Sequence, residues 1–464
     1  MKKIITSLLM LALVISLMTA FTSCGEPSLE ELPADERAIE LDKLSSEKMD
    51  RATSYDAKTS GTISFKMNDI DVTADISGKQ QLLLTETSTL MHQEESTEIS
   101  IANTTEITKS TRGYANGKAY INDVSSGKKI AFYSEMPFDD YKAHINRKSD
   151  DVISAFNAES ASEKTSVKRS DGGWSLVFEG FSNSAKADLA KQFETLLGST
   201  EVSDVKVSIV LDEDLYYKSF IMDIFFPDDS NFKELSFRID FSSVNAGTVE
   251  IDDVDFDDYT KVPDIRVLDK LDDALNYIPE EGEKQTVNVK ISQFQYANGN
   301  TSSQNETDNI VYETVDGKLG YEITAERSSS LKTKQVISYK DGTQTIEKYN
   351  PSGKIYNTST KESNDTAEKA YILGIINTVK YDMSVLKTMT VSEDDPNTYI
   401  LTCDVPAAFM DTSSYQSAEL TIKVTLDADG NIAQIFNEVY IKISSLNGNY
   451  YSLKVTCKFG ATAE

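Results

Sequence analysis

The sequence is poor in the residues that most often perform catalysis or bind metals. It contains two His (His92 and His144), three Cys and one Trp among 464 residues. A His-based zinc site or a Ser-His-Asp arrangement needs more partners at ligand spacing than this. Glycine-rich phosphate-binding patterns, G-x-S-x-G and H-E-x-x-H are missing as well. We therefore expect no enzyme activity, no cofactor and no metal, and an extracytoplasmic hydrolase built on a carboxylate pair is the least favoured alternative.

Positive charge is also scarce. The 46 Lys and Arg are outnumbered by 75 Asp and Glu, which gives a formal charge of −29. Such a surface repels phosphate backbones, so nucleic acid is excluded as a partner. Beyond the N-terminus, no apolar run approaches the ~20 residues that a membrane-spanning helix needs. Membrane association is therefore expected only at the N-terminal end.

The N-terminus carries an export signal. Lys2 and Lys3 precede an uncharged apolar run from Ile4 to Met18, and Phe21-Thr22-Ser23 leads directly into Cys24. A charged start, a short apolar stretch and small residues before a cut site are typical of a secretory signal peptide, here residues 1–23.

With Cys24 at the cut position, this segment resembles the lipobox of bacterial lipoproteins. The resemblance implies that Cys24 is lipidated on sulfur and becomes the first residue of the mature protein. The chain would then be extracytoplasmic and anchored in the membrane by lipid, with residues 24–35 as a lipidated tether. An ordinary secretory signal with a chance cysteine is the alternative.

The remaining chain contains an internal repeat. Five short matches occur in the same order in both halves, first at offsets of 225 to 227 and then at 215 to 216. They join 41–44 to 268–271, 126–128 to 352–354, 174–178 to 399–403, 211–214 to 426–429, and 237–241 to 453–457. A period this long indicates tandem domains rather than a solenoid. The short polar segment 257–264 separates a first domain, 36–258, from a second, 265–464.

Each copy combines helix and strand signals. Segments 184–197, 265–275 and 366–380 have apolar residues at helical spacing. Segments such as 205–211 and 235–241 alternate apolar and polar residues, as is typical of strands with one solvent-exposed face. We expect an α+β fold of two tandem repeats, each a curved antiparallel sheet packed on one or two helices.

A lipobox, a leading helix and a long antiparallel meander together resemble the LolA/LolB and LppX envelope lipoproteins. That resemblance implies an unclosed β half-barrel with helices as a lid over an apolar cavity. Five residues of the first copy are expected to line such a cavity: Phe220, Met222, Ile224, Phe237 and Ile239.

Several other residue groups allow two interpretations. Cys403 and Cys457 align with Phe178 and Phe241 of the first copy, so free core thiols are favoured over a disulfide. The acidic run 252–258 is taken as a solvated segment rather than a calcium site, because it lacks an EF-hand pattern. Segment 427–431 is expected to form a hairpin turn. Core packing is favoured over ligand contact for the aromatics Tyr114, Tyr120, Phe132, Tyr133 and Trp174.

Three functional hypotheses follow. The favoured one is a lipid-anchored, non-enzymatic protein that binds a lipid or another apolar small molecule. The first alternative is a structural, adhesive or protein-binding module whose core is filled by its own side chains. The second, from a different class, is the hydrolase considered above. A protein partner cannot be named from these patterns.

Overall fold

The computed structural model describes two compact units, residues up to Tyr259 and from Thr260 onward. The described residues are 29, 32–67, 70–101, 104–125, 128–153, 165–170, 172–192, 201–227, 232–245, 249–279, 282–315, 317–328, 332–381, 383–406, 415–443 and 449–460. The signal segment 1–23 and Cys24 lie outside them. The division falls inside the polar segment 257–264.

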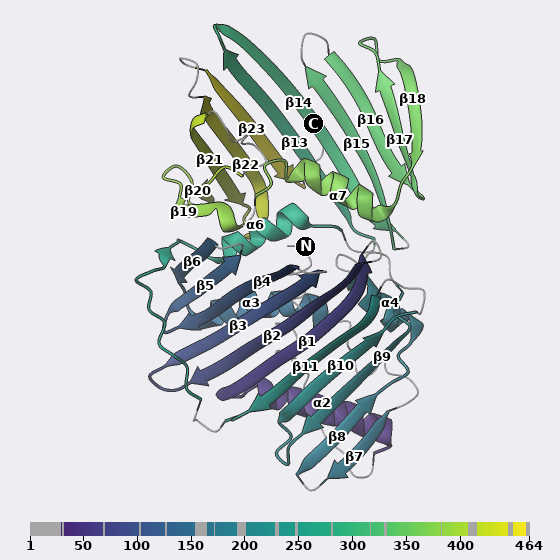
Figure 1. The fold of residues 1–464 in the computed structure, drawn as a ribbon, viewed down its shortest axis with the longest axis vertical. Coiled ribbons are helices and arrows are strands. Elements are labelled where there is room, and N and C mark those ends of the chain that lie inside the picture. The colour runs from purple at the N-terminus through teal and green to yellow at the C-terminus, as the bar shows by residue number, and fades with distance from the viewer. Residues whose placement is uncertain are drawn as a thin grey trace. The chain divides into compact units, whose positions relative to one another are not determined.

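The described residues of the first unit form three helices and a large sheet (Figure 1). The helices are α2 (Ala34–Asp50), α3 (Phe138–Ile153) and α4 (Asn183–Gln192). The strands are β1 (Ser54–Met67), β2 (Ile70–Leu84), β3 (Thr89–Ile101), β4 (Thr104–Ala115), β5 (Lys118–Ser125), β6 (Lys128–Glu135), β7 (Ser166–Ser170), β8 (Gly173–Phe178), β9 (Asp204–Leu211), β10 (Tyr217–Phe225) and β11 (Phe232–Ser242). The two-residue β12 (Thr260–Lys261) follows at the unit boundary.

The second unit repeats the order of strands, the leading helix and the helix after the sixth strand, but no helix corresponding to α4 occurs among its described residues. Its helices are α6 (Arg266–Asn276), α7 (Asp365–Ile376) and the short η2 (Met383–Val385). Its strands are β13 (Lys284–Ala297), β14 (Asn300–Val315), β15 (Lys318–Ser328), β16 (Lys332–Lys340), β17 (Thr343–Tyr349), β18 (Ile355–Glu362), β19 (Leu386–Val391), β20 (Thr398–Cys403), β21 (Tyr415–Leu426), β22 (Ile432–Ile443) and β23 (Tyr450–Phe459).

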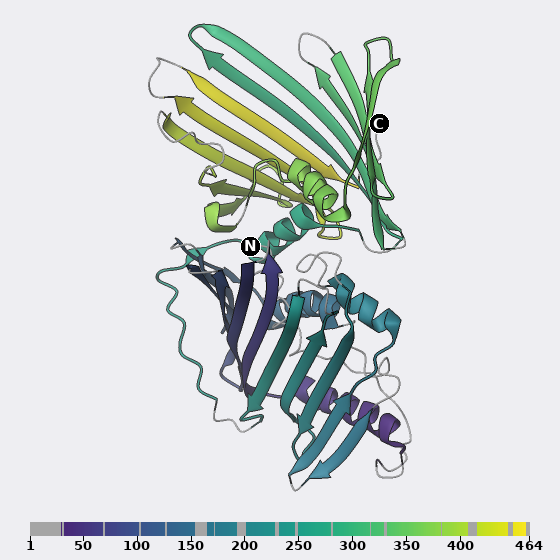
Figure 2. The same cartoon turned by 45° about the vertical axis from the view of Figure 1, so that its right-hand side comes forward.

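The sheets have the same strand order. The first reads β12-β6-β5-β4-β3-β2-β1-β11-β10-β9-β8-β7 and the second β18-β17-β16-β15-β14-β13-β23-β22-β21-β20-β19. Apart from β12, each strand of one sheet has its counterpart at the same place in the other. The pairings described are antiparallel, and each sheet is curved and not closed (Figures 1 and 2).

The expected α+β class is wrong. Strands take 60% of the chain and helices 16%, so the protein is mostly β, with sheets of 12 and 11 strands. The helical segments read from the sequence do form, but they are short. Strands such as β2 and β14 run to 15 and 16 residues. Because apolar residues alternate along these long strands, one face of each sheet carries most of the core.

The helices lie on one face of each sheet, which we call the inner face. Ala38 and Leu41 of α2 belong to the same buried cluster as Phe220 and Phe237. In the second unit α7 packs on β13 and β15 (Figure 2), and Ile372 and Ile376 are buried. No helix among the described residues is long and apolar enough to cross a membrane.

Helix ends follow local polar chemistry. Asn364 Oδ1 accepts a hydrogen bond from the Ala367 amide at 2.9 Å and caps α7. Ser182 Oγ accepts a hydrogen bond from the Ala185 amide at 3.2 Å and caps the start of α4. The helix expected over 184–197 is described to Gln192, and residues 193–197 lie outside the described part.

Candidate functional site

The five expected cavity residues lie in the core of the first unit. They sit on the inner faces of β10 and β11, where Phe220 pairs with Ile239 and Met222 with Phe237. All five, Ile224 included, are between 0 and 5% exposed and belong to one buried cluster with α2. Their packing partners are therefore the side chains of the protein itself.

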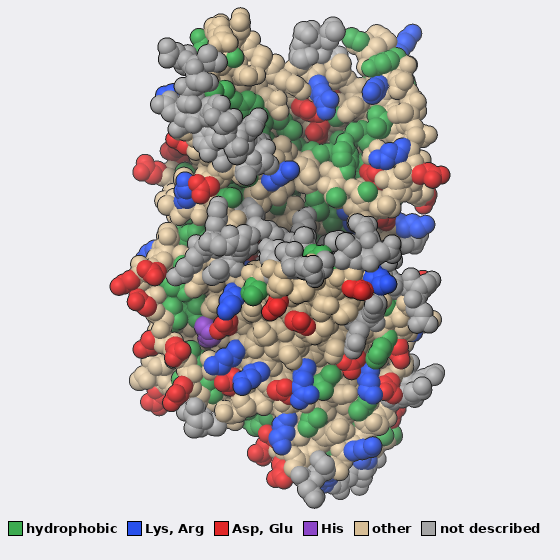
Figure 3. Space-filling model, viewed as in Figure 1, with side chains coloured by type: hydrophobic (Ala, Val, Ile, Leu, Met, Phe, Trp, Pro, Cys, Tyr) green, Lys and Arg blue, Asp and Glu red, His purple; other side chains and the backbone are tan. Residues whose placement is uncertain are grey.

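On the inner face of the second unit, hydrophobic side chains lie beside acidic and basic ones (Figure 3). One row of directly paired residues crosses this face from core to solvent. We call it the second carboxyl row: Val424, Ile435, Cys457, Val289, Asp308, Ala325, Gln335 and Lys348. Its apolar members are buried, Gln335 is half-buried and Lys348 is exposed. Asp308 is the buried acid of the row, and a single buried residue, Ala325, separates it from the half-buried Gln335.

Asp308 is a buried carboxyl without a complete set of partners. It is 5% exposed, and its Oδ1 has no hydrogen-bond partner among the described residues. Burial, assisted by Glu306, raises the pKa of Asp308 to about 7, and Arg327 opposes this shift. Arg327 Nε contacts Glu306 Oε1 at 2.6 Å, so these two side chains neutralise each other.

Tyr371 belongs to α7, which packs over the inner-face strands β13 and β15 on either side of β14. Its side chain is 40% exposed. Burial is the largest cause that raises the pKa of Tyr371, and the charges of Asp308 and Glu368 add to it. The ring of Tyr371 also lies 6.4 Å from that of Tyr321, centroid to centroid. Asp308, Glu306, Arg327 and Tyr371 together form what we call the Asp308 site.

A fully satisfied polar network fixes α7 next to this site. Glu368, 2% exposed, accepts hydrogen bonds from Tyr321 Oη at 2.5 Å and Gln344 Nε2 at 2.8 Å, and its other oxygen accepts from Ser363. Asp365 accepts from Tyr339 Oη at 2.6 Å. Because α7 is held by its own carboxyl groups, the position of Tyr371 over the inner face is well defined.

The first unit has a buried carboxyl in the equivalent row. The first carboxyl row reads Ile209, Phe220, Ile239, Thr59, Gly78, Glu95, Ser110 and Asp123. Glu95 is 4% exposed and accepts from Gln93 Nε2 at 3.0 Å. Burial raises the pKa of Glu95 to about 8, and Arg112 lowers it while Asp123 raises it. The pKa of each buried carboxyl is thus influenced by one further acid and one arginine: Asp123 and Arg112 for Glu95, and Glu306 and Arg327 for Asp308.

Sequence reasoning missed both carboxyls. A signal was present for Asp308, because it shares the inward-facing phase of β14 with Ile310 and Tyr312. A lone acid in such a phase is unusual, since buried charges require partners. No comparable signal marks Glu95, since Gln93 and Thr97 on the same face of β3 are polar as well.

The remaining candidates take structural roles. Cys403 and Cys457 are free and buried, which confirms the favoured interpretation, and burial raises the pKa of each thiol to about 12. His92 lies on β3, where Nδ1 is 2.8 Å from Tyr120 Oη. Tyr114, Tyr120, Phe132 and Trp174 are buried, and Tyr133 packs against Phe256.

Two acidic segments show no metal-binding arrangement. Residues 249–259 form an irregular segment, and no group of three His, Cys, Asp or Glu suited to a metal occurs within the described parts of the chain. Segment 427–431 is the expected hairpin turn: Asp427 Oδ1 accepts from the amides of Asp429 and Asn431 at 2.9 and 2.8 Å.

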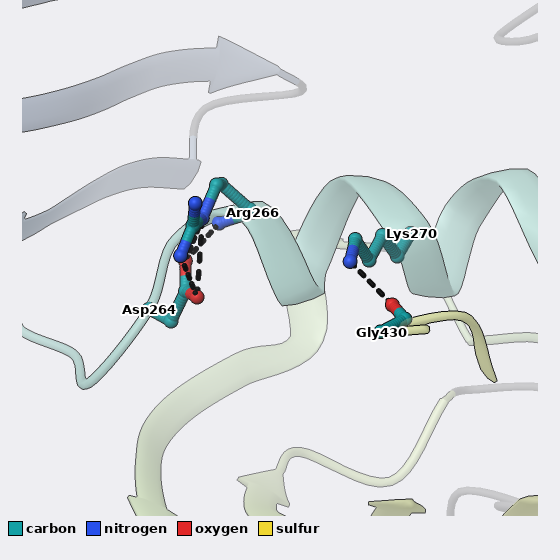
Figure 4. A network of polar contacts seen from close by, with 4 residues as sticks. All are labelled: Asp264, Arg266, Lys270 and Gly430. Carbon is teal, nitrogen blue, oxygen red and sulfur yellow. Dashed lines mark hydrogen bonds and ion pairs between the residues drawn. The ribbon is translucent and has the colours of Figure 1, made fainter. Parts of the chain in front are cut away.

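The leading helix of the second unit is tied to that hairpin. The Asp264 carboxylate accepts hydrogen bonds from the backbone amide and the guanidinium of Arg266, with Nη2 at 2.8 Å from Oδ2 (Figure 4). Lys270 Nζ donates to the Gly430 carbonyl. In the first unit Lys48 of α2 donates to the Asp214 carbonyl of the matching hairpin. In each unit the leading helix thus donates a hydrogen bond to one hairpin, which joins β9 to β10 in the first unit and β21 to β22 in the second.

Comparisons with known proteins do not assign a family. No family model and no curated protein matches the sequence. Among solved structures, similarity extends to the translocator domain of autotransporter NalP from Neisseria meningitidis, with 5% identity, 87% of each chain covered and a TM-score of 0.11. Pseudomonas aeruginosa OccK3 gives 7% identity, 88% and 95% coverage and a TM-score of 0.14. A porin-like protein from Bacteroides uniformis is 8% identical, with 87% of this chain and 95% of that chain covered and a TM-score of 0.09. Similarity this low carries no argument about fold or function.

Proposed function

We propose that the protein is a lipid-anchored, extracytoplasmic binding protein that takes a ligand with an apolar part on the inner face of its second unit. The observation that carries this proposal is the Asp308 site. A buried carboxyl with an unused oxygen lies on the inner face of β14, and α7, which packs over the neighbouring strands, carries the part-exposed ring of Tyr371. Mostly apolar surfaces with a few converging polar groups are typical of ligand sites.

The first unit supports a structural role instead. Its five expected cavity residues are packed against α2, and Glu95 already has a side-chain partner. This is the arrangement expected of a self-filled module. We therefore assign the ligand to the second unit and a supporting or protein-binding role to the first.

The anchor rests on the N-terminal sequence. A diacylglycerol on Cys24 would supply two chains, and two lipid chains suffice for stable attachment where one is marginal. Metabolic labelling with an alkyne fatty acid tests this. The wild type and Cys403→Ser should carry the label and sediment with membranes, whereas Cys24→Ala should do neither. Label on Cys24→Ala, or none on the wild type, would contradict the anchor.

Ligand binding is tested on residues 25–464, which contain every described residue of both units. Native mass spectrometry without detergent, combined with lipid extraction, should show one apolar molecule per chain, either co-purified or taken up from added lipid. A mass that remains that of the ligand-free chain after addition of decanol and phospholipid would contradict the binding proposal. The self-filled module would then be the better explanation for both units.

A further inference from the structure

The charge balance of the Asp308 site selects among ligands. Glu306 and Arg327 form an ion pair at 2.6 Å, so the third charge, on Asp308, has no matching cation in the site. The three groups carry one net negative charge when Asp308 is ionised. An anionic ligand would meet repulsion there, and a neutral ligand would leave the charge uncompensated.

An ammonium group supplies what the site lacks. Its charge would balance the carboxylate, and its N–H bonds would supply the hydrogen bond that the buried Oδ1 of Asp308 lacks. Tyr371, on the helix that packs over the adjacent strands, is 40% exposed, and an aromatic ring of this kind attracts a cation. A carboxylate and an aromatic ring on one inner face are thus suited to a cationic amine.

The adjacent strand provides the apolar side of the site. Asp308 pairs with Val289 and Glu306 with Ile291 on β13. Val289 is fully buried, whereas Ile291 is half-buried. An alkyl chain attached to the ammonium group would lie along Ile291, with its charged end at Asp308.

We infer that the Asp308 site binds the ammonium group of an amphipathic amine, with Asp308 as the carboxylate partner and Tyr371 as the ring beside it. This inference rests on the proposed function and names its ligand class. The first unit is the internal control. Its Glu95 lies in the equivalent row but already accepts a hydrogen bond from Gln93.

Three probes of equal chain length separate the ligand classes: decylamine, decanol and decanoate. They are titrated into residues 25–464 at pH 8 by calorimetry, where the amine is charged and Asp308 is ionised. Decylamine should bind at least about tenfold more tightly than decanol, and decanoate should bind most weakly. Asp308→Asn should remove the advantage of the amine and leave decanol affinity unchanged.

The matched variants complete the test. Glu95→Gln should leave all three affinities within about twofold, and Tyr371→Leu should weaken decylamine about threefold. Equal binding of amine and alcohol, or a decylamine advantage that persists in Asp308→Asn, would overturn the inference while the apolar binding function stands. Failure of all three probes would overturn both. If Asp308→Asn does not fold, Tyr371→Leu and the order of the wild-type affinities decide.

Discussion

The two units share a strand order but differ in where they place one buried acid. In the first carboxyl row, Gly78 on β2 faces Glu95 on β3. In the second, the equivalent pair is Asp308 on β14 and Ala325 on β15. The acid thus comes from opposite members of the same cross-strand pair, and a small residue stands opposite it each time.

The small partner has a steric reason. A Cβ on Gly78 would come within 3.3 Å of Glu95 Cγ and 3.0 Å of the Glu94 carbonyl, so the Glu95 side chain occupies that space. A neutral core would be the simpler solution at such a position, because buried carboxyls oppose stability. That both units keep an acid there, by different routes, indicates that the position tolerates or uses a charge.

The largest expected effect tests whether the units are independent. Leu41 of α2 and Leu268 of α6 are both fully buried at matching positions. Truncating either to Ala should cost about 3 kcal/mol, because a cavity remains in a packed core. Calorimetry should show that Leu41→Ala lowers one unfolding transition and Leu268→Ala the other. A loss in both transitions from either variant would contradict independent units.

The next effect depends on pH. Folding raises the pKa of Asp308 to about 7 and that of Glu95 to about 8. The folded state therefore holds protons that the unfolded chain releases above about pH 4, so stability falls as pH rises from 4 to 8. At pH 8 Asp308→Asn and Glu95→Gln should each stabilise their unit by about 1 to 2 kcal/mol, an effect that vanishes at pH 4. Urea denaturation at both pH values measures this.

The outcome of that experiment also bears on the ligand. Decylamine should restore stability to the wild type at pH 8, because binding to the folded state alone shifts the unfolding equilibrium. Asp308→Asn should gain less from decylamine, and Glu95→Gln should gain as much as the wild type. A stability that does not change between pH 4 and 8 would contradict the burial of both carboxyls.

The sequence predicted the repeat and the hairpins but not the register. Sequence matching aligned Cys403 with Phe178. In the structure Phe178 pairs with Val207, and the counterpart of Val207, 215 positions later, is Ile422. Ile422 pairs with Leu401. Leu401, not Cys403, therefore corresponds to Phe178. A slip of two residues preserves the alternation of apolar and polar positions, so periodicity cannot detect it.

The same slip affects the other cysteine. In the first unit Phe220 pairs with Ile239. The counterpart of Phe220 in the second unit is Ile435, and Ile435 pairs with Cys457. Cys457 therefore corresponds to Ile239 rather than Phe241. Only cross-strand pairing, a contact between residues distant in sequence, reveals the carboxyl rows, whereas the phase of β14 marks Asp308 alone and nothing in β3 marks Glu95.

A smaller effect tests the matching hairpins. Asp212 and Asp427 each accept two amide hydrogen bonds in the same pattern, and the following αL position holds Leu215 (φ 64°) in one unit and Gly430 (φ 78°) in the other. Gly430→Ala should cost about 1 kcal/mol, because a side chain strains this conformation. Leu215→Gly should change stability by less than about 0.5 kcal/mol, since relief of strain offsets the lost contacts and the flexibility of glycine. Thermal unfolding of both variants measures the difference.

The smallest effect separates a contact from its surroundings. Lys48 and Lys270 each donate to a hairpin carbonyl, but the first contact is exposed and the second partly buried. Lys270→Met should therefore cost about 0.5 to 1 kcal/mol, and Lys48→Met less than about 0.3 kcal/mol, because solvent screens the exposed charge. Because the acceptor is a neutral carbonyl, the difference between the two variants should change little in 1 M salt. A difference that shrinks in salt would indicate that Coulomb attraction dominates the contact. Equal costs for the two variants would mean that burial does not set the strength of this shared contact, and the two hairpins would then be energetically as well as geometrically equivalent.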